Sequence, residues 1–458
     1  MFKKILIANR GEIAIRIMRT CREMGIEYVC VHSTADREAL HVQLAEETVC
    51  IGGPRSEDSY LNIANILQAA LSTGCDAIHP GYGFLSENAD FAELVVAAGL
   101  TFIGPTAATI RQLGDKSNAR TLMIEAGVPV IPGSDGLLSS VEEALDLAAE
   151  IGYPILLKAT SGGGGRGMRR VDNPEEMEAA FYSAKRESQV NFADDGIYLE
   201  KLIQKAKHIE VQILADRHGN IIQLGERDCS LQRKRQKLIE ESPCATLQDA
   251  LRKDLCDAAV TAAEAASFLG AGTVEFVVEP DGSFYFMEVN TRIQVEHTVT
   301  EVLTGIDLIA EQIRIANGAK LSLSQDEVQV RGHAIECRIN AESPALGFRP
   351  SPGQIESFNL PGGFFVRVDS SMYAGCKIPP YYDSLIAKII VHGSSRREAM
   401  RRMRRCLEEL IVEGVDTNVG LLYVLLFEND MIKGTYDTNY VETNMEQLLD
   451  YASLMETE

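Results

Sequence analysis

The stretch at residues 288–297 places polar side chains at every second position, directly after the strand-like run 283–287. Alternate side chains of an extended backbone point to opposite faces, so this stretch predicts a strand with one polar and one apolar face. Solvated strands also alternate, but their polar positions favour Lys, Thr and Ser rather than an arginine between carboxylates and amides. The polar positions are Glu288, Asn290, Arg292, Gln294 and Glu296, and the positions assigned to the core are Met287, Val289, Ile293 and Val295.

A second apolar run at 272–279 precedes this stretch, and the residues 280–283 between them are Pro-Asp-Gly-Ser. Two extended runs joined by such a turn predict an antiparallel hairpin. The hairpin would bring Glu275 beside Glu288, with Asn290 on the same face. Two carboxylates and an amide oxygen suit Mg²⁺ (or Mn²⁺), which binds through a few carboxylates and nucleotide phosphates. Taken alone, Glu275 would equally be an exposed acid.

A glycine-rich loop at 161–167 lies between two predicted strands, 155–159 and 168–171. A Walker loop opens a helix instead, so this order predicts a strand-loop-strand lid. Consecutive glycines let backbone amides approach phosphate oxygens and let the loop hinge. A flexible linker is the alternative, but a linker would not be held between two strands with Lys158 leading into it. Together with the hairpin acids, the lid predicts a site that binds ATP and transfers its γ-phosphoryl group.

Composition limits the class of protein. A chain of 458 residues is long enough for about three domains. Its 44 Lys and Arg against 66 Asp and Glu give a net charge of −22, which disfavours nucleic acid and anionic membranes as partners. The sequence has no apolar stretch long enough to span a membrane, its ten cysteines are scattered and no secretory leader is visible, so we expect a cytoplasmic protein. An anionic substrate would need a local cationic pocket.

The first 112 residues alternate predicted strands and helices, beginning with strands at 4–8 and 28–32 around one helix. This order predicts a Rossmann-like open α/β lobe with a parallel sheet. The turn at 9–12 lacks Gly-x-Gly-x-x-Gly, so a dehydrogenase is disfavoured. The loop 79–87 follows a strand, where such sheets bind ligands.

Changes in composition predict two further domains and a tail. The region 113–330 would bind ATP and include a mobile lid at about 131–203. A mixed β/α domain is expected at 331–446, followed by a tail at 447–458.

Five basic residues gather within 226–237. In so acidic a chain such a run is either a solvated surface or an anion pocket, and the sequence leaves both open. Lys237, with Arg292 and Arg338, would place positive charge near the metal, which predicts a small anion as second substrate. Glu296 among these cations would be a weak base, yet it could take a proton from an acid whose anion they stabilise. Bicarbonate fits, and because its phosphorylation would give a labile anhydride, the lid would also exclude water.

The chain resembles the biotin carboxylases, the ATP-grasp subunits of bacterial acetyl-CoA carboxylase and related biotin-dependent carboxylases, over essentially its whole length. The matching motifs are HPGYGFLSEN (79–88), KATSGGGGRGMR (158–169), EKLI (200–203), HIEVQ (208–212), RDCSLQR (227–233), GTVEF (272–276), MEVNTRIQVEH (287–297) and ECRINAE (336–342). The resemblance implies a multidomain chain of α/β and α+β class: an ATP-grasp fold preceded by the Rossmann-like lobe and followed by a mixed β/α C-terminal domain.

The resemblance also implies roles for individual residues. The residues that would bind the nucleotide are Lys116, Lys158, Gly164, Gly165, Glu200, Lys201, Leu202, Ile203, His208, Gln232 and Arg235, with Glu275 and Glu288 through the metal. The implied metal ligands are Glu275, Glu288 and Asn290. The residues that would bind bicarbonate or biotin are Lys237, Arg292, Gln294, Val295, Arg338 and Tyr82, and the catalytic set is Glu296, Arg292, Lys237 and Arg338.

The implied reaction begins when Glu296 deprotonates bicarbonate, which attacks the γ-phosphorus of MgATP to give carboxyphosphate. This collapses to CO₂ and phosphate, phosphate deprotonates biotin, and Arg338 stabilises the biotin enolate that attacks CO₂. Because the sequence lacks a Met-Lys-Met biotinylation signal, we expect a separate biotin carboxyl carrier protein and separate carboxyltransferase subunits. The final acceptor is expected to be acetyl-CoA, in fatty acid synthesis through malonyl-CoA, with another acyl-CoA or pyruvate as the alternative. Family members are commonly dimers, and candidate interface positions are Arg19, Glu23, Phe364 and Arg367.

Two departures from the family pattern stand out. Arg235 replaces the histidine that bacterial members usually carry beside the nucleotide, and Thr298 follows Glu-His where proline is usual. The alternatives to a biotin carboxylase are another ATP-grasp ligase, such as one making carbamoyl phosphate, and a catalytically silent nucleotide-binding or scaffold subunit.

Overall fold

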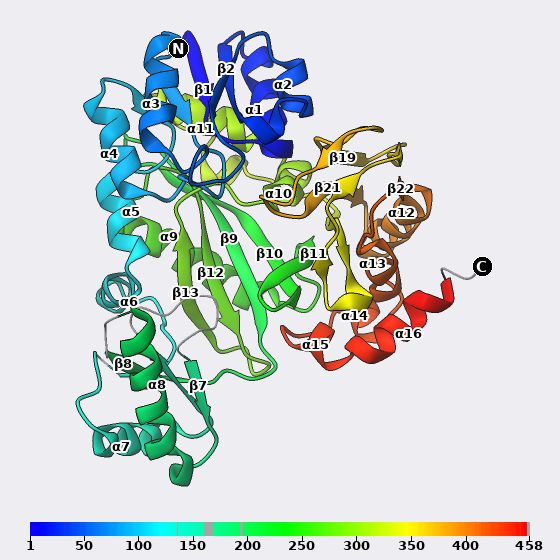
Figure 1. Ribbon diagram of the computed structural model, residues 1–458. Helices are drawn as coiled ribbons and strands as arrows, with labels where there is room; N and C mark the ends of the chain where they lie inside the picture. The colour runs from blue at the N-terminus through cyan, green and yellow to red at the C-terminus, as the bar shows by residue number, and fades with distance from the viewer. Residues whose placement is uncertain (135, 160–167, 193–195, 456–458) are drawn as a thin grey trace.

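The structure is a computed structural model that describes residues 1–134, 136–159, 168–192 and 196–455 (Figure 1). The N-terminal lobe, in blue, lies above a large central sheet, in green. A smaller unit that contains α7 and α8 projects below this sheet, and the C-terminal elements, in yellow to red, lie to its right.

The N-terminal lobe has a parallel five-stranded sheet in the order β3-β2-β1-β4-β5, as the alternating pattern predicts. Its strands are β1 (Lys4–Ile7), β2 (Glu27–Ser33), β3 (Thr48–Gly52), β4 (Ala77–His79) and β5 (Thr101–Phe102). Its helices are α1 (Gly11–Glu23), η1 (Thr34–Asp36), α2 (Leu40–Leu44), α3 (Ile63–Ser72), α4 (Ala89–Ala97) and α5 (Ala107–Gly114), and α6 (Lys116–Glu125) follows. The strands β1, β2 and β4 are short and almost wholly buried, as expected of a sheet covered on both faces.

The small unit below the central sheet is built on a three-stranded antiparallel sheet in the order β7-β6-β8. Its elements are α7 (Val141–Ile151), β6 (Ile155–Ala159), β7 (Met168–Val171), η2 (Pro174–Glu176), α8 (Met177–Phe192) and β8 (Ile197–Lys201). Ser140 caps α7 by accepting a hydrogen bond from the Glu143 backbone N–H. Leu157, Phe181 and other apolar residues of the unit form a core of their own. The predicted strand-loop-strand order is therefore confirmed for the two strands, while the glycine loop lies outside the described residues.

The central sheet has eight antiparallel strands in the order β13-β12-β9-β10-β11-β14-β21-β19. They are β9 (Lys207–Ala215), β10 (Ile221–Arg233), β11 (Gln236–Ser242), β12 (Gly270–Val278), β13 (Phe284–Asn290), β14 (His333–Asn340), β19 (Val366–Ser370) and β21 (Leu385–Gly393). Because β14 pairs with β11, the sheet continues into the C-terminal part of the chain.

Helices and short strands cover this sheet and complete the C-terminal part. The helices are α9 (Asp249–Ala265), α10 (His297–Thr304), α11 (Leu308–Ala316), η3 (Gln325–Glu327), η4 (Pro344–Leu346), α12 (Arg396–Glu409), α13 (Val419–Leu425), α14 (Asn429–Lys433), α15 (Tyr440–Thr443) and α16 (Met445–Met455). The short strands are β15 (Glu342–Ser343), β16 (Arg349–Pro350), β17 (Gly353–Gln354), β18 (Ser357–Asn359), β20 (Lys377–Ile378) and β22 (Ile411–Glu413). Among the described residues no helix is both long and apolar enough to span a membrane.

The hairpin of β12 and β13 confirms the predicted pairing, with Glu275 directly opposite Glu288. The register shifts just after this pair, so that Phe276 lies opposite Phe286 and Met287 is the extra residue of a β-bulge. Met287 is 43% exposed, and its assignment to the core is wrong because the bulge turns it out of the alternation.

The polar stretch leaves the strand after Asn290, earlier than a regular alternation would predict. Val289 and Ile293 are buried as predicted, and Ile293 packs in a cluster shared with the N-terminal lobe. Val295 is only half-buried and lies outside the strand, so its first assignment to the core is wrong. Helix α10, which the sequence reading did not predict, begins at His297 and fixes the end of this segment.

Candidate functional site

A cleft of about 1700 Å³ opens between the N-terminal lobe, the small three-stranded unit and the face of the central sheet. Most residues selected from the sequence line this cleft, although they are spread over more than 250 positions of the chain. The lining members of that set are Tyr82, Lys116, Lys158, Glu200, Ile203, His208, Gln232, Arg235, Lys237, Glu275, Glu288, Asn290, Arg292, Gln294, Val295, Glu296 and Arg338. Lys201 and Leu202 do not line it, and Gly164 and Gly165 lie outside the described residues.

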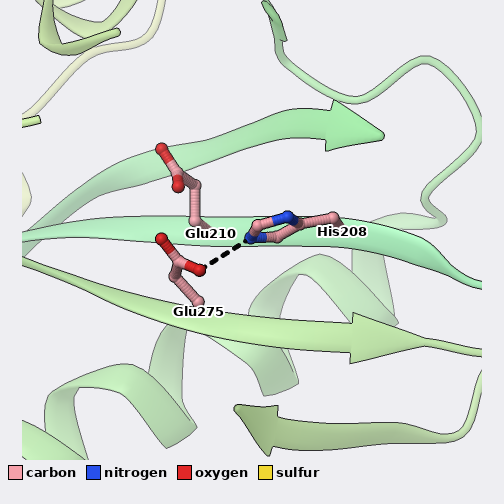
Figure 2. A group of neighbouring side chains, drawn as sticks. All are labelled: His208, Glu210 and Glu275. Atoms are coloured by element: carbon pink, nitrogen blue, oxygen red, sulfur yellow. Dashed lines mark hydrogen bonds and ion pairs between the residues drawn. The ribbon is translucent and has the colours of Figure 1, made fainter. Parts of the chain in front are cut away.

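Three carboxylates lie in a row across neighbouring strands of the cleft floor. Glu210 on β9 is paired in register with Glu275 on β12, which in turn faces Glu288 on β13. Figure 2 shows Glu210 and Glu275 rising from the same face of the sheet beside His208, whose Nε2 lies 2.9 Å from Glu275 Oε2. Burial opposes the charge on His208, but the Glu275 carboxylate raises the pKa of the imidazole above its usual value.

The ammonium group of Lys237 lies among the acids. Its Nζ is 2.6 Å from Glu210 Oε2 and 3.5 Å from Glu275 Oε1, and it also forms a short ion pair with Glu296. His208, Glu210 and Glu275 have the spacing of a cation site, but Lys237 supplies the positive charge at Glu210 and Glu275. Burial opposes ionisation of Lys237, but the surrounding Cys229, Glu210 and other acids outweigh it and hold the pKa well above its usual value.

Glu288 differs from the other two acids of the row. Its carboxylate makes no hydrogen bond or ion pair with another residue in the described part of the chain. Desolvation and the negative charge of Glu275 raise the pKa of the Glu288 carboxyl, whereas Lys116 and His208 act in the opposite direction. Asn290 instead donates from Nδ2 to Glu275 Oε1 at 2.7 Å. Two facing carboxylates with one poorly compensated charge are suited to a divalent cation.

Glu296 is fully buried at the base of the cleft. Its Oε1 accepts from Lys237 Nζ, and its Oε2 accepts from Arg338 Nη2 at 2.8 Å. Burial disfavours the carboxylate, but Lys237, Arg338 and Arg227 together hold the pKa of Glu296 well below its usual range. Glu296 is therefore ionised and bracketed by cations on both oxygens.

Arg292 lines the cleft together with Glu296. Its Nε donates to Glu87 Oε2 at 2.7 Å, and its two Nη atoms donate to Gln294 Oε1 at 2.9 Å and to Asn290 Oδ1 at 3.1 Å. Gln294 also donates to Glu275 Oε1 at 3.1 Å. These bonds place a guanidinium and an amide beside Glu296 and the carboxylate row, as the sequence predicts for an anion-binding wall.

Two lysines approach the cleft from the other side. Lys158, on β6 of the small unit, forms a short ion pair with Glu200 on the neighbouring strand β8. Lys116 is the first residue of α6 and is exposed to the cleft. Both lie opposite the acidic row and could contact an elongated anion held between the sheet and the small unit.

Some residues of the basic run at 226–237 lie in the anion-binding cleft and others at the surface, so both alternatives that the sequence left open apply in part. Arg227 is fully buried and donates to Glu210 at 2.5 Å, while Lys237 lies in the cleft. Arg233 instead donates to the Gly347 carbonyl at 3.0 Å on the surface. The exposed Arg235 lines the cleft, and its Nη2 lies 3.6 Å from the sulfur of Met168 in the small unit.

Sequence reasoning missed several residues that organise this site. Glu87 lies in a motif we singled out but was given no role, although it holds Arg292. Glu210 stands at a polar position of the alternating run 208–214, which is a signal that could have identified it. Arg227 and Glu336 lie in stretches we singled out but were given no role of their own. The missed groups without a local signal are Glu12, Glu240 and Lys388, whose partners are distant in the sequence.

Comparison with known proteins identifies the family. The sequence matches the models for the biotin carboxylase N-terminal domain over 1–110, the carbamoyl-phosphate synthase L chain ATP-binding domain over 115–324 and the biotin carboxylase C-terminal domain over 336–443. A biotin carboxylase of Nostoc sp. is 56% identical over 441 residues, which cover 96% of this chain and 99% of that protein. The chain belongs to the biotin carboxylase family.

Other biotin carboxylases support the same assignment. Biotin carboxylase 1 of Bacillus subtilis is 54% identical over 444 residues, which cover 97% of this chain and 99% of that protein. A solved structure with the same fold is the biotin carboxylase domain dimer of Hydrogenobacter thermophilus 2-oxoglutarate carboxylase in complex with MgADP, ADP and bicarbonate. It is 48% identical with a TM-score of 0.91, and the match covers 98% of this chain and 99% of that one. As a biotin carboxylase family member, this chain is an ATP-dependent ligase with an ATP-grasp fold.

Proposed function

We propose that this enzyme uses ATP and bicarbonate to carboxylate biotin through carboxyphosphate. The observation that carries the proposal is the position of the Glu296 carboxylate at the end of the acidic row, where one oxygen accepts from Lys237 and the other accepts from Arg338. An ATP site beside a buried base surrounded by cations is suited to activating a small acid whose conjugate base is an anion.

Glu275, Glu288 and Asn290 would hold Mg²⁺ or Mn²⁺. The donor set fits, because Glu288 lies directly opposite Glu275, and a divalent cation would offset the desolvation and the repulsion from Glu275 that raise the pKa of Glu288. Bound there, the ion would neutralise phosphate charge during phosphoryl transfer. Hydrogen bonds from His208 and Asn290 fix the carboxylate of Glu275, and the carboxylate of Glu288 remains available to the ion.

The remaining nucleotide contacts come from opposite sides of the cleft. Lys116 and Lys158 would bind the phosphates, and Glu200 is placed on the strand beside Lys158. The residues assigned to the base and ribose are Glu200, Lys201, Leu202, Ile203, His208, Gln232 and Arg235. Of these, Lys201 and Leu202 would act through their backbone, because they lie outside the cleft lining.

Bicarbonate would bind against Lys237, Arg292, Gln294, Arg338 and the backbone at Val295. Glu296 with its low pKa is a weak base in the resting protein. When bicarbonate takes over part of the ion pairing of Glu296, Lys237 and Arg338 stabilise the carbonate dianion that forms from it. The proton of bicarbonate moves to Glu296. The deprotonated anion then attacks the γ-phosphorus of ATP, and the bond from that phosphorus to the bridging oxygen breaks to release ADP. Water must be kept out while the resulting carboxyphosphate survives.

The second half of the reaction would use the same cations. Carboxyphosphate releases CO₂ and phosphate, the phosphate removes the N1 proton of biotin, and Arg338 stabilises the resulting enolate while it attacks CO₂. Tyr82 lines the cleft in the N-terminal lobe and would contact biotin. Biotin would be carried on a biotin carboxyl carrier protein and would continue to carboxyltransferase subunits.

For the final acceptor we propose acetyl-CoA, in a complex that supplies malonyl-CoA for fatty acid synthesis. A solved biotin carboxylase subunit of pyruvate carboxylase, 48% identical to this chain, supports pyruvate as the second candidate, and a different acyl-CoA is the other alternative. We also propose a homodimer. Arg19, Glu23 and the 76% exposed Phe364 are available for its interface, whereas Arg367 is engaged with Glu301 and Asp369.

One assay tests this function against its alternative. ADP release is measured with ATP, Mg²⁺, bicarbonate and free biotin, and each component is omitted in turn. The proposal expects release that requires bicarbonate and rises with biotin. Release that rises with ammonia but not with biotin would instead favour carbamoyl phosphate synthesis, which the family model matched at 115–324 raises as an alternative.

A further inference from the structure

A fully buried lysine lies where three parts of the chain meet. Lys388 on β21 has no exposed surface, and its Nζ donates to the backbone carbonyl oxygen of Val295 at 2.7 Å. The same ammonium lies 3.1 Å from Oε1 of Glu12, in the first turn of α1. One side chain from the C-terminal part therefore joins the segment after β13 to the N-terminal lobe.

The charge on Lys388 is maintained by its surroundings. Burial opposes ionisation, but Glu12, Glu336 and Asp369 outweigh it and raise the pKa of the ammonium. A buried charge is tolerated only when it is paired and hydrogen-bonded. Both its neighbours at bonding distance, the Val295 carbonyl and the Glu12 carboxylate, are acceptors.

The first of these acceptors belongs to the anion-binding wall. Val295 stands between Gln294 and Glu296, in a segment that has left the strand at Asn290 and has not yet entered α10. Its neighbours Gln294 and Glu296 both reach into the cleft with buried side chains. A change in the direction of the Val295 peptide would therefore move both of them relative to Lys237 and Arg338.

The second acceptor belongs to the predicted biotin end of the cleft. The hydroxyl of Tyr82 donates to the same Oε1 of Glu12 in a short hydrogen bond. Oε2 of Glu12 is buried without a partner in the part of the chain that the structure describes, so this carboxylate depends on Lys388 and Tyr82. Lys388 is thus linked to Tyr82 through Glu12 and to Glu296 through the Val295 peptide.

We propose that Lys388 is a positioning residue that fixes the anion-binding segment 291–296 relative to Tyr82, and so aligns the bicarbonate and biotin ends of the site. This rests on the proposed function for its substrates. Lys388 does not line the cleft and would contact neither substrate. It acts through the Val295 carbonyl and through Glu12.

The decisive comparison uses Lys388→Met with and without Glu12→Gln. Lys388→Met alone leaves the Glu12 charge buried and unpaired, and the variant could lose stability for that reason only. The double variant Glu12→Gln/Lys388→Met removes both charges, while Asp369 keeps its pairing with Arg367 at 2.7 Å. Glu12→Gln alone is the matched control, since it leaves Lys388 on the Val295 carbonyl.

Two measurements are made on each full-length variant. In steady-state ADP release, we expect the double variant to raise the KM for bicarbonate about tenfold or more, with the KM for ATP within about twofold of the wild-type value. In hydrogen–deuterium exchange without substrates, we expect faster exchange of the amides of 291–297 in both Lys388 variants, and wild-type exchange there in Glu12→Gln.

The opposite results would overturn the proposal. If the double variant recovers the wild-type bicarbonate KM and exchange, Lys388 only neutralises Glu12. If the KM values for ATP and bicarbonate rise equally, the effect is general rather than local. If the wild-type enzyme shows no bicarbonate-dependent ADP release, the proposed function fails, and the exchange of 291–297 still decides whether Lys388 holds the segment.

Discussion

Glu275 and Glu288 face each other across the β12–β13 hairpin, and Glu288 lacks a hydrogen-bond partner among the described residues while Glu275 is held by His208 and Asn290. This asymmetry gives the pair one fixed acid and one acid available for a cation. Burial opposes the charge on Glu275, but Lys237 and His208 outweigh it and lower the pKa of Glu275, whereas desolvation and the Glu275 charge raise the pKa of Glu288.

Glu288→Gln should weaken Mn²⁺ binding in the presence of ADP by about tenfold or more, because it removes a carboxylate ligand from the predicted metal site. Calorimetric titration with Mn²⁺ measures this. Asp281→Asn, in the exposed turn of the same hairpin, is the control and should bind Mn²⁺ as the wild type does. Equal Mn²⁺ affinity in Glu288→Gln and the wild type would remove Glu288 from the metal site.

Thr298 follows Glu-His where most relatives are expected to carry proline, and its hydroxyl donates to Glu336 Oε2 in a short hydrogen bond. Both residues are buried, and Glu336 Oε1 has no partner among the described residues. Thr298→Val should therefore lower the free energy of unfolding by about 1 to 3 kcal/mol, since it leaves a buried carboxyl group without its donor. Urea denaturation measures the difference, and an unchanged midpoint would contradict the importance of this bond.

The stability of the enzyme should fall as pH rises toward 9. Burial raises the pKa of Glu336 from 4.5 to about 8, and that of its cross-strand neighbour Glu240 to about 7. A carboxyl group with a raised pKa in the folded state stabilises the fold fully below its unfolded pKa, and this contribution is lost as pH rises through the folded pKa. Glu336→Gln cannot lose this proton, so its Tm should fall less than the wild-type Tm between pH 6 and 9.

Thermal melts at several pH values provide that comparison. The matched control is Glu413→Gln, which changes an exposed acid on β22 and should follow the wild-type profile. Parallel pH profiles for Glu336→Gln and the wild type would show that Glu336 is ionised throughout this range, contrary to the raised pKa.

Arg235 extends from the β10–β11 turn toward Met168 of the small unit and lines the cleft. Arg235→Ala should raise the KM for ATP severalfold with little change in kcat, because the side chain would contribute to nucleotide binding rather than to the chemical step. Lys234→Ala is the neighbouring control, since its exposed side chain does not line the cleft. If both variants retain the wild-type KM for ATP, Arg235 has no role in nucleotide binding.

The hairpin shows how much of this site could be predicted from sequence. Alternation and a four-residue turn were enough to place Glu275 opposite Glu288, because the pairing in a hairpin is set locally by the turn. The bulge at Met287 inserts one residue without altering the composition of either strand, so alternation alone could not predict it. Helix α10 was missed because its start at His297 follows directly on the polar pattern.

The contacts that hold the site from behind could not be predicted in this way. Lys388 and Glu12 are 376 positions apart, and nothing near either one indicates the other. Within β21, Lys388 interrupts an apolar run, which by itself indicates only an edge or a paired charge. Tertiary structure is needed to show that its ammonium reaches the Val295 carbonyl.

Glu296→Gln is the most direct test of the central claim, that a carboxylate bracketed by Lys237 and Arg338 takes the proton from bicarbonate. The amide is nearly isosteric but cannot accept the proton, so bicarbonate-dependent ADP release should fall at least about tenfold while ADP binding stays within about twofold of the wild type. Asp281→Asn should retain wild-type turnover. Turnover by Glu296→Gln at the wild-type rate would contradict the assignment of Glu296 as the base.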